Sequence, residues 1–362
     1  MEENKFCPAD DLALKTIATL VGRDGAQKIR VGYCVSCGYV GYIDRPTKDW
    51  INRFYLTTWD RAEEKNTDEV VAMFKNKFQQ MDVGKKGELG RLEEIDKKFN
   101  FNKNQYALDL GCGYGKKMKL FADLGFKNVV GIENSAHRAE VARKIYSFRV
   151  FTSAFEDPST QVELKKLWPI ELIHSKHVLE HTYNPAEIIR LASLLQARGG
   201  YFVLSLPNIL GEISLLTLIF FPHLHGFSKD ALECLMNKYG YEVVDNKFTT
   251  SEENYVIARK LSAPIVPKKN NLNYTEILIN KFKQGLAFGD YDFTPRLFWC
   301  SRKKDIGGQI AGGLILRNYF HFTNRNQKIL SALVEELKTR YTSFEESPIE
   351  IQFSGNIKLA YK

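Results

Sequence analysis

The stretch LDLGCGYG, Leu108 to Gly115, constrains the fold more than any other part of the sequence. It joins a short apolar strand to a turn with glycine at alternate positions, Gly111, Gly113 and Gly115. Glycine adopts positive φ without steric cost and has no side chain to keep a ligand away from the peptide groups. A dinucleotide-binding turn needs G-x-G-x-x-G, but the position that would complete it is Lys116. The sequence therefore predicts a turn that binds a nucleoside rather than a dinucleotide.

The chain after this turn alternates between strand and helix patterns. Apolar strands are expected at 127–135, 148–152, 170–175, 200–208 and 254–260. Helices are expected between them, at 116–124, 136–146 and 186–196. This alternation is typical of a doubly wound parallel sheet covered by helices on both faces. We therefore expect an α/β fold with a Rossmann-like sheet.

The second strand of this series ends in Glu133, which lies 20 residues after Gly113. An open α/β sheet places at this distance the carboxylate that accepts hydrogen bonds from both ribose hydroxyls. Ser135 follows in a position to cap the next helix. The spacing thus supports a bound nucleoside.

Together with the acidic Asp109, the glycine turn resembles the first motif of class I S-adenosylmethionine-dependent methyltransferases. The run HVLEH…NP…GGYFVLSLPN and the segment HLHGFSKDALECLMNKYGYEVV are similar to the small-molecule branch of this class, and the resemblance covers roughly Asn104 to Lys260. It implies a methyltransferase sheet and S-adenosylmethionine as cofactor. It implies the cofactor-binding residues Asp109, Gly111, Gly113, Gly115, Glu133, Asn134, Ala154, Phe155 and Ser175. The family often has an aspartate where Ala154 stands, so adenine contact is assigned to the Phe155 region.

Histidine is the natural base near neutral pH, and five of the seven histidines lie between 174 and 225. His174 lies within an apolar strand and is expected to be a core residue. The predicted catalytic residues are His177, His181 and His225. His177 follows a strand end, where ligands bind in open α/β sheets. His223 and His225 flank Leu224, where relatives commonly have a histidine that faces the acceptor. His225 is favoured over His223 because it directly precedes a helix start.

The LEH motif, Leu179 to His181, allows a second interpretation of this loop as a metal site. Ubiquinone-type O-methyltransferases resemble this loop, carry a glutamate where His177 stands, and hold a divalent ion with acidic residues and the LEH pair. His177, Glu180 and His181 could meet on one side of a helical turn and bind such an ion.

The N-terminal segment YCVSCGYVGYIDRPTKDWINRFY, Tyr33 to Tyr55, resembles the second half of a zinc ribbon that precedes the catalytic domain in many sugar and polysaccharide methyltransferases. The first half of such a ribbon is a CPxC knuckle, but here it reads Cys7-Pro8-Ala9-Asp10. The ligand set implied is Cys7, Asp10, Cys34 and Cys37, since carboxylate oxygen is an acceptable zinc ligand. The alternative is a degenerate ribbon held together by its apolar residues.

At 362 residues the chain is too long for one such domain. We expect a ribbon-like module at 1–55, a helical linker or cofactor lid at 56–103, the methyltransferase domain at 104–260 and a basic α+β extension at 261–362. The longest apolar stretch, Ile209 to Pro222, is too short and polar to span a bilayer. Within it, Ile213 to Phe221 is expected to be a lid helix, a buried helix or a lipid-facing surface. Without a secretory signal or a regular cysteine framework, the sequence predicts a cytoplasmic protein.

Residues 260–362 hold 16 Lys and Arg against 9 Asp and Glu, so most of the net charge of +8 lies there. A basic surface of this kind attracts anionic partners. We expect an anionic small-molecule acceptor, with methyl transfer to a hydroxyl or carbon of a sugar, sugar nucleotide or surface-glycan precursor. A nucleic-acid, lipid or quinone methyltransferase is the alternative within enzymes, although the N-P-P-[YF] signature of base methylation is absent. A non-catalytic partner that keeps the cofactor pocket is the alternative of another class.

Overall fold

The computed structural model describes most of the chain. The residues described are 2–21, 28–54, 66–73, 88–211, 223–266, 272–286, 296–301, 312–317, 343–348, 350–353 and 357–360. The predicted helix at Ile213 to Phe221 lies outside these residues.

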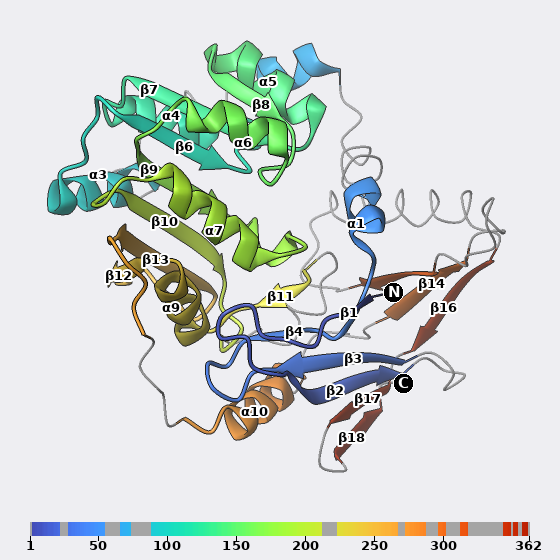
Figure 1. Ribbon diagram of the computed structural model, residues 1–362. Coiled ribbons are helices and arrows are strands. Elements are labelled where there is room, and N and C mark those ends of the chain that lie inside the picture. Colours follow the sequence, from blue (N-terminus) through green and yellow to red (C-terminus); the bar gives the residue numbers. More distant parts are fainter. Residues whose placement is uncertain are drawn as a thin grey trace.

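A seven-stranded sheet occupies the upper left of the view in Figure 1. Its strand order is β12-β13-β10-β9-β6-β7-β8. Strands β10, β9, β6, β7 and β8 pair in parallel, while β13 runs antiparallel to both its neighbours. The bounds are β6 Tyr106–Leu110, β7 Asn128–Glu133, β8 Arg149–Thr152, β9 Ile170–Lys176, β10 Tyr201–Pro207, β12 Tyr241–Asp245 and β13 Glu253–Lys260. The predicted doubly wound α/β fold is confirmed.

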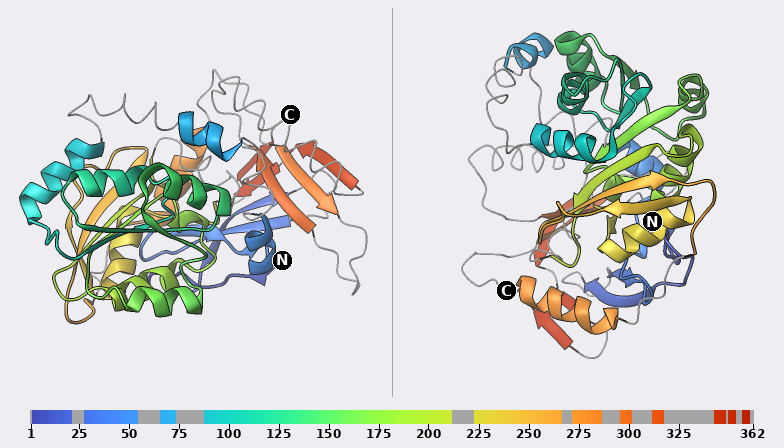
Figure 2. Two further views of the ribbon diagram at one scale, coloured as in Figure 1. Left: turned by 90° about the horizontal axis from the view of Figure 1, so that it is seen from above. Right: turned by 90° about the vertical axis from the view of Figure 1, so that its left-hand side faces the viewer.

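Helices cover both faces of this sheet (Figures 1 and 2). One buried cluster lies on each face of the sheet, because successive side chains of a strand point to opposite sides. One cluster joins the sheet to α3 (Glu88–Phe99), α4 (Lys116–Asp123) and α5 (Ala136–Tyr146). The other joins it to α6 (Pro158–Lys165), α7 (Pro185–Leu195) and α9 (Lys229–Lys238).

Side-chain caps fix where four of these helices begin. Ser135, Asp157, Asn184 and Ser228 each accept a hydrogen bond from a backbone N–H in the first turn of the helix that follows. Such caps satisfy N–H groups that have no partner inside the helix. Because each cap follows a strand or loop at the same end of the sheet, the caps also fix the loops in which the candidate site lies.

A second sheet joins residues from both ends of the chain. Its order is β11-β4-β3-β2-β17-β18, and Figure 1 shows the blue N-terminal strands beside the red C-terminal ones. The pairing of β17 with β2 places part of the predicted C-terminal extension on the predicted N-terminal module. The bounds are β2 Lys15–Val21, β3 Lys28–Tyr33, β4 Val40–Tyr42, β11 His225–Gly226, β17 Glu350–Phe353 and β18 Ile357–Ala360.

The remaining elements are short. A two-stranded pair joins β1 (Glu2–Glu3) to β5 (Asp44–Arg45), and a three-stranded sheet has the order β15-β14-β16. The three strands are β14 (Arg296–Ser301), β15 (Gly312–Arg317) and β16 (Ser343–Pro348). Two further helices are α1 (Lys48–Phe54) and α10 (Tyr274–Leu286). Among the described residues, no helix has the length and apolarity that crossing a membrane requires.

Candidate functional site

The glycine turn lies at the carboxyl end of β6. Gly111, Gly113 and Gly115 have φ of 70°, 52° and 81°, a region that L side chains rarely adopt. A Cβ added at Gly111 would lie 2.4 Å from Val178 Cγ2, whereas one at Gly113 would meet nothing within 4 Å. The first glycine is therefore needed for close packing, while the second presents open backbone, as the sequence predicts for a ligand-binding turn.

Glu133 lies beside this turn at the end of β7. Its two carboxylate oxygens accept hydrogen bonds from the backbone N–H of Gly113, at 2.8 Å, and of Ser135, at 2.9 Å. The carboxylate is half-buried and is held in one orientation by peptide groups on either side. This geometry fits a carboxylate that accepts hydrogen bonds from ribose hydroxyls.

Asp109 lies in the core instead of at the open edge. It is 2% exposed, and its Oδ1 lies 2.7 Å from Nδ1 of His174 on the neighbouring strand β9. His174 is 1% exposed and packs edge-on against Phe121, so its predicted place in the core is confirmed. Asp109 thus has a buried partner in place of the cofactor contact predicted from the sequence.

The other predicted cofactor residues lie around the same edge. The backbone N–H of Ser153 donates to the carbonyl of Glu133, which brings the turn with Ala154 and Phe155 beside the second strand. Ala154 is half-buried and Asn134 is exposed, whereas Phe155 is buried in the core. Ser175 is 1% exposed, and its hydroxyl has no hydrogen-bond partner in the described part of the chain.

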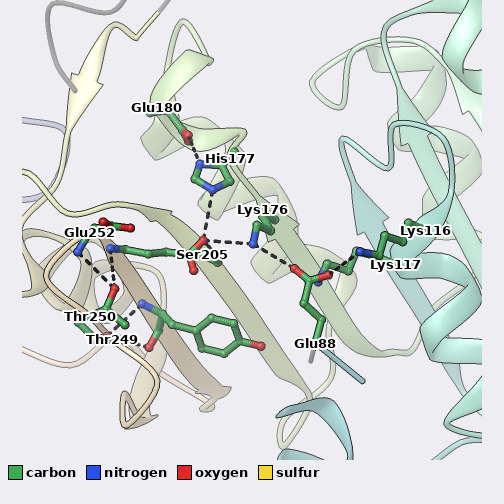
Figure 3. Close-up of polar contacts among 12 residues, drawn as sticks. Glu88, Lys116, Lys117, Lys176, His177, Glu180, Ser205, Thr249, Thr250 and Glu252 are labelled. Carbon is green, nitrogen blue, oxygen red and sulfur yellow. Dashed lines mark hydrogen bonds and ion pairs between the residues drawn. The ribbon is translucent and has the colours of Figure 1, made fainter. Parts of the chain in front are cut away.

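His177 has both ring nitrogens beside carboxylates (Figure 3). Nδ1 lies 3.1 Å from Oε1 of Glu180, and Nε2 lies 3.2 Å from Oε1 of Glu253. Burial alone would lower the pKa of His177, but these hydrogen bonds outweigh it and raise the pKa to about 9. His177 is therefore a cation at neutral pH, and the predicted role of a free base is not what this structure presents.

His181 and His223 lie together beside Glu180. The two rings have centroids 4.6 Å apart, and one potential ligand atom from each of the three residues lies within 4.8 Å of the others. Glu180 is 1% exposed, and its Oε2 has no hydrogen-bond partner among the described residues. The grouping differs from the metal set predicted from the LEH motif, because His223 takes the place of His177.

His225 is buried on β11, where this strand pairs with β4. Nδ1 lies 2.5 Å from the hydroxyl of Tyr39, and Nε2 lies 2.9 Å from the carbonyl of Thr182. Burial lowers the pKa of His225 to about 3, so the ring is neutral, with Nε2 donating to the carbonyl. A catalytic base needs a ring nitrogen that faces the acceptor, whereas both ring nitrogens of His225 have partners within the chain. The catalytic role of His225 stays a prediction.

The four predicted metal ligands of the N-terminal module meet in one place. The Sγ atoms of Cys7 and Cys37 are 3.6 Å apart, and Sγ of Cys34 lies 3.1 Å from Oδ2 of Asp10. One ligand atom from each residue lies within 4.8 Å of the others, and all three cysteines are buried.

Sequence reasoning missed two residues of the site, Glu253 and Glu88. Oε1 of Glu253 lies near Lys176, His177 and Ser205, and Glu88 contacts Lys176 from the start of α3. A signal for Glu253 was present: an antiparallel last strand begins at the edge where the parallel strands end. No comparable signal marks Glu88.

Comparison with known proteins identifies the central part of the chain. Residues 76–246 match the family model described as "Methyltransferase domain". This part of the chain is therefore a methyltransferase domain. The prediction of this class from the glycine turn and Glu133 is confirmed. No curated protein matches the chain.

Several solved structures are similar to part of the methyltransferase. A SAM-dependent methyltransferase from Archaeoglobus fulgidus is 17% identical, with 52% of this chain and 98% of that chain covered at a TM-score of 0.38. Magnesium protoporphyrin IX methyltransferase from Synechocystis, with bound SAH, is 15% identical, and the match covers 59% of this chain and 100% of that chain at a TM-score of 0.41. An S-adenosylmethionine-dependent methyltransferase from Clostridium acetobutylicum is 14% identical, with 54% and 99% covered at a TM-score of 0.41.

Replacing Glu133 by alanine should weaken binding of S-adenosylhomocysteine by about 1.5–3 kcal/mol, or roughly 10–150-fold, because the ribose hydroxyls lose a charged acceptor. Isothermal titration calorimetry measures the change. Glu140→Ala is the matched control, since Glu140 is exposed on the outer face of α5 and pairs with Lys144. Equal affinity in the two variants would show that Glu133 does not hold the ribose.

The pH dependence of stability should contain a contribution from His225. Its pKa is about 3 in the folded protein and near 6.5 when unfolded, so the unfolded chain binds the extra proton between these values. The stability that His225 contributes is therefore present above pH 6.5 and is lost as the pH falls toward 3. Urea unfolding from pH 7 to 4 should show a shallower loss for His225→Gln than for the unchanged protein. If the free energy of unfolding falls equally with pH in both proteins, the lowered pKa assigned to His225 is contradicted.

Proposed function

We propose that the enzyme methylates a hydroxyl or carbon of a small anionic molecule, and that this acceptor is a sugar, a sugar nucleotide or a surface-glycan precursor. The proposal is supported by the position of the ribbon-like module relative to the loops that face the acceptor in this fold. The ribbon-plus-domain arrangement resembles sugar methyltransferases, and fold-level resemblance is the link to the acceptor class.

The contact between the module and these loops is the observation that carries the proposal. Strand β4 of the module pairs with β11, where Gly41 lies opposite His225. The hydroxyl of Tyr39 and the carbonyl of Thr182 hold the two nitrogens of His225, so one imidazole joins the module to the loop that follows the LEH motif. The carbonyl of Cys37 also accepts a hydrogen bond from the hydroxyl of Ser228 at 2.6 Å. The module thus supports the acceptor side of the domain.

The residues at this edge act mainly by positioning. When bound, S-adenosylmethionine supplies a methyl group that its sulfonium already activates. Orientation of two reactants can contribute about 7–11 kcal/mol, whereas a general base adds about 10²–10⁴-fold in rate, or roughly 3–5 kcal/mol. Glu133 and the turn at Gly113 would orient the nucleoside. Of the predicted catalytic histidines, His181 keeps the role of proton acceptor, because His177 is held as a cation and His225 is buried.

The cysteine cluster fits a structural zinc ion. With Zn–S bonds of about 2.3 Å and Zn–O bonds of about 2.1 Å, a tetrahedral site places two sulfurs about 3.8 Å apart and a sulfur and an oxygen about 3.6 Å apart. The Cys7–Cys37 distance of 3.6 Å and the Cys34–Asp10 distances of 3.1 and 3.4 Å are close to these values. Zinc held by Cys7, Asp10, Cys34 and Cys37 would fix the module against α9.

A metal-assisted transfer to vicinal hydroxyls, as on a quinone precursor, is the second candidate. The observation that favours it is the cluster of Glu180, His181 and His223, which offers one carboxylate and two imidazoles. Two histidines and a carboxylate are a common ligand set for Zn²⁺ and Fe²⁺.

The acceptor class is tested with labelled S-adenosylmethionine and a panel of nucleotide sugars, free sugars, catechols, DNA and RNA. We expect methyl incorporation into a nucleotide sugar, and reduced incorporation at low S-adenosylmethionine concentration with Glu133→Ala, which serves as the cofactor-binding control. Preferred incorporation into a catechol or nucleic acid would contradict the proposal. Binding of S-adenosylhomocysteine without turnover of any member would instead favour a non-catalytic partner.

Metal content separates the two metal proposals. Protein purified without a histidine tag should contain one zinc per chain, and Cys34→Ser should lose it. A second metal equivalent that is lost in His223→Ala and kept in Cys34→Ser would support the cluster of Glu180, His181 and His223. Metal-free protein with unchanged thermal stability would end the zinc proposal.

A further inference from the structure

Three lysines meet beside the glycine turn. Lys116 and Lys117 begin α4 directly after Gly115, and Lys176 ends the neighbouring strand β9. Strands β6 and β9 are adjacent, but the helices that follow them, α4 and α7, cover opposite faces of the sheet. In an open α/β sheet this reversal marks the crevice in which ligands bind. The lysines therefore lie where a ligand is expected.

A carboxylate of the chain itself is bound between these lysines (Figure 3). Oε1 of Glu88 lies 3.0 Å from Nζ of Lys176, and Oε2 contacts Nζ of Lys117 and lies 3.7 Å from Nζ of Lys116. Burial alone would raise the pKa of Glu88, but the lysines outweigh it and lower the pKa to about 2. The two oxygens are thus held by two different elements, in an arrangement that recognises a planar or tetrahedral anion.

The amount of positive charge exceeds what one carboxylate balances. The side chain of Lys117 is 14% exposed, and a buried ammonium is rare unless it is paired. Lys176 has a second carboxylate, Glu253, at 3.3 Å, but the same oxygen of Glu253 also lies within 3.2 Å of His177. Glu88 is therefore the main counter-charge for Lys116 and Lys117. A phosphate, with up to two negative charges, would satisfy these cations better than a single carboxylate.

Glu88 is suited to leave this position because of where it comes from. It is the first residue of α3, a helix that precedes the first strand of the sheet, whereas the three lysines belong to β9 and to the helix that follows β6. Moving the Glu88 side chain breaks none of the sheet hydrogen bonds. The lysines would remain in place, ready for another anion.

We propose that Lys117 and Lys176 form a binding site for an anionic group, a phosphate or a carboxylate, and that Glu88 occupies this site until the ligand replaces it. The group belongs either to the acceptor or to the amino-acid part of the cofactor, and in the first case the identity of the ligand rests on the proposed function. The site itself does not, because its chemistry requires only an anion.

The site is tested by measuring, with calorimetry, how tightly inorganic pyrophosphate binds to the full chain at low ionic strength. Glu88→Gln should bind pyrophosphate at least tenfold more tightly than the unchanged protein, since the competing carboxylate is gone. Lys117→Met and Lys176→Met should each bind pyrophosphate at least tenfold more weakly than the unchanged protein. Lys119→Met is the matched control, because Lys119 lies on the same helix and pairs with Asp123.

The gain expected for Glu88→Gln cannot arise from misfolding, so the test does not depend on the lysine variants folding well. Equal affinity in Glu88→Gln and the unchanged protein would overturn the proposal. An equal loss in Lys117→Met and Lys119→Met would also overturn it, because pyrophosphate would then respond to general surface charge.

Two cofactor products distinguish whether the cofactor or the acceptor supplies the anion. S-adenosylhomocysteine carries a carboxylate and 5′-methylthioadenosine does not. If the cofactor supplies the anion, Lys117→Met should weaken S-adenosylhomocysteine about tenfold and leave methylthioadenosine unchanged. If the acceptor supplies it, pyrophosphate should bind equally well to protein saturated with S-adenosylhomocysteine. If no sugar nucleotide is methylated but Glu88→Gln still binds pyrophosphate more tightly, only the proposal of a sugar-nucleotide acceptor is refuted.

Discussion

The parallel pairing of β6 with β7 and β9 is the constraint on which the candidate site depends. Leu110 pairs with Ile132 on one side and with Ser175 on the other, so three strands end at the same level of the sheet. Glu133 reaches the glycine turn only because of this register, and the carbonyl of Ile132 accepts hydrogen bonds from both Gly111 and Cys112. A slip of one residue would point every side chain of the slipped strand to the opposite face. The register is secured inside the sheet by the buried pair of Asp109 and His174.

Buried polar contacts join the N-terminal module to the loops at the edge of the seven-stranded sheet. His225 connects Tyr39 of the N-terminal module to the carbonyl of Thr182, and Ser228 caps α9 while donating to the carbonyl of Cys37. Buried polar groups are costly unless they are paired, so these contacts fix one relative placement of module and loop. The module therefore does more than precede the domain in sequence. It determines the shape of the loop that carries the histidines.

The sequence was sufficient to predict what depends on local pattern. The glycine turn, the position of Glu133, the doubly wound sheet implied by alternation and the core position of His174 all follow from spacing and apolar periodicity. The role of His225 could not be predicted, because its partner Tyr39 is 186 residues away and nothing in either segment indicates the other. The same holds for Glu88, which lies 88 residues before Lys176. Long-range polar pairs carry no periodic signal, and only the folded chain reveals them.

Charges alternate along the edge of the sheet, and this order is consistent with a sulfonium donor. Glu180, His177, Glu253, Lys176 and Glu88 follow one another, each within 3.3 Å of the next. Four cations, the three lysines and His177, would by themselves repel a positively charged methyl donor, since like charges a few ångströms apart are strongly unfavourable in a partly buried site. The interleaved carboxylates cancel most of this field. The cationic state of His177 is thus compatible with methyl transfer as long as its two carboxylates, Glu180 and Glu253, stay in place.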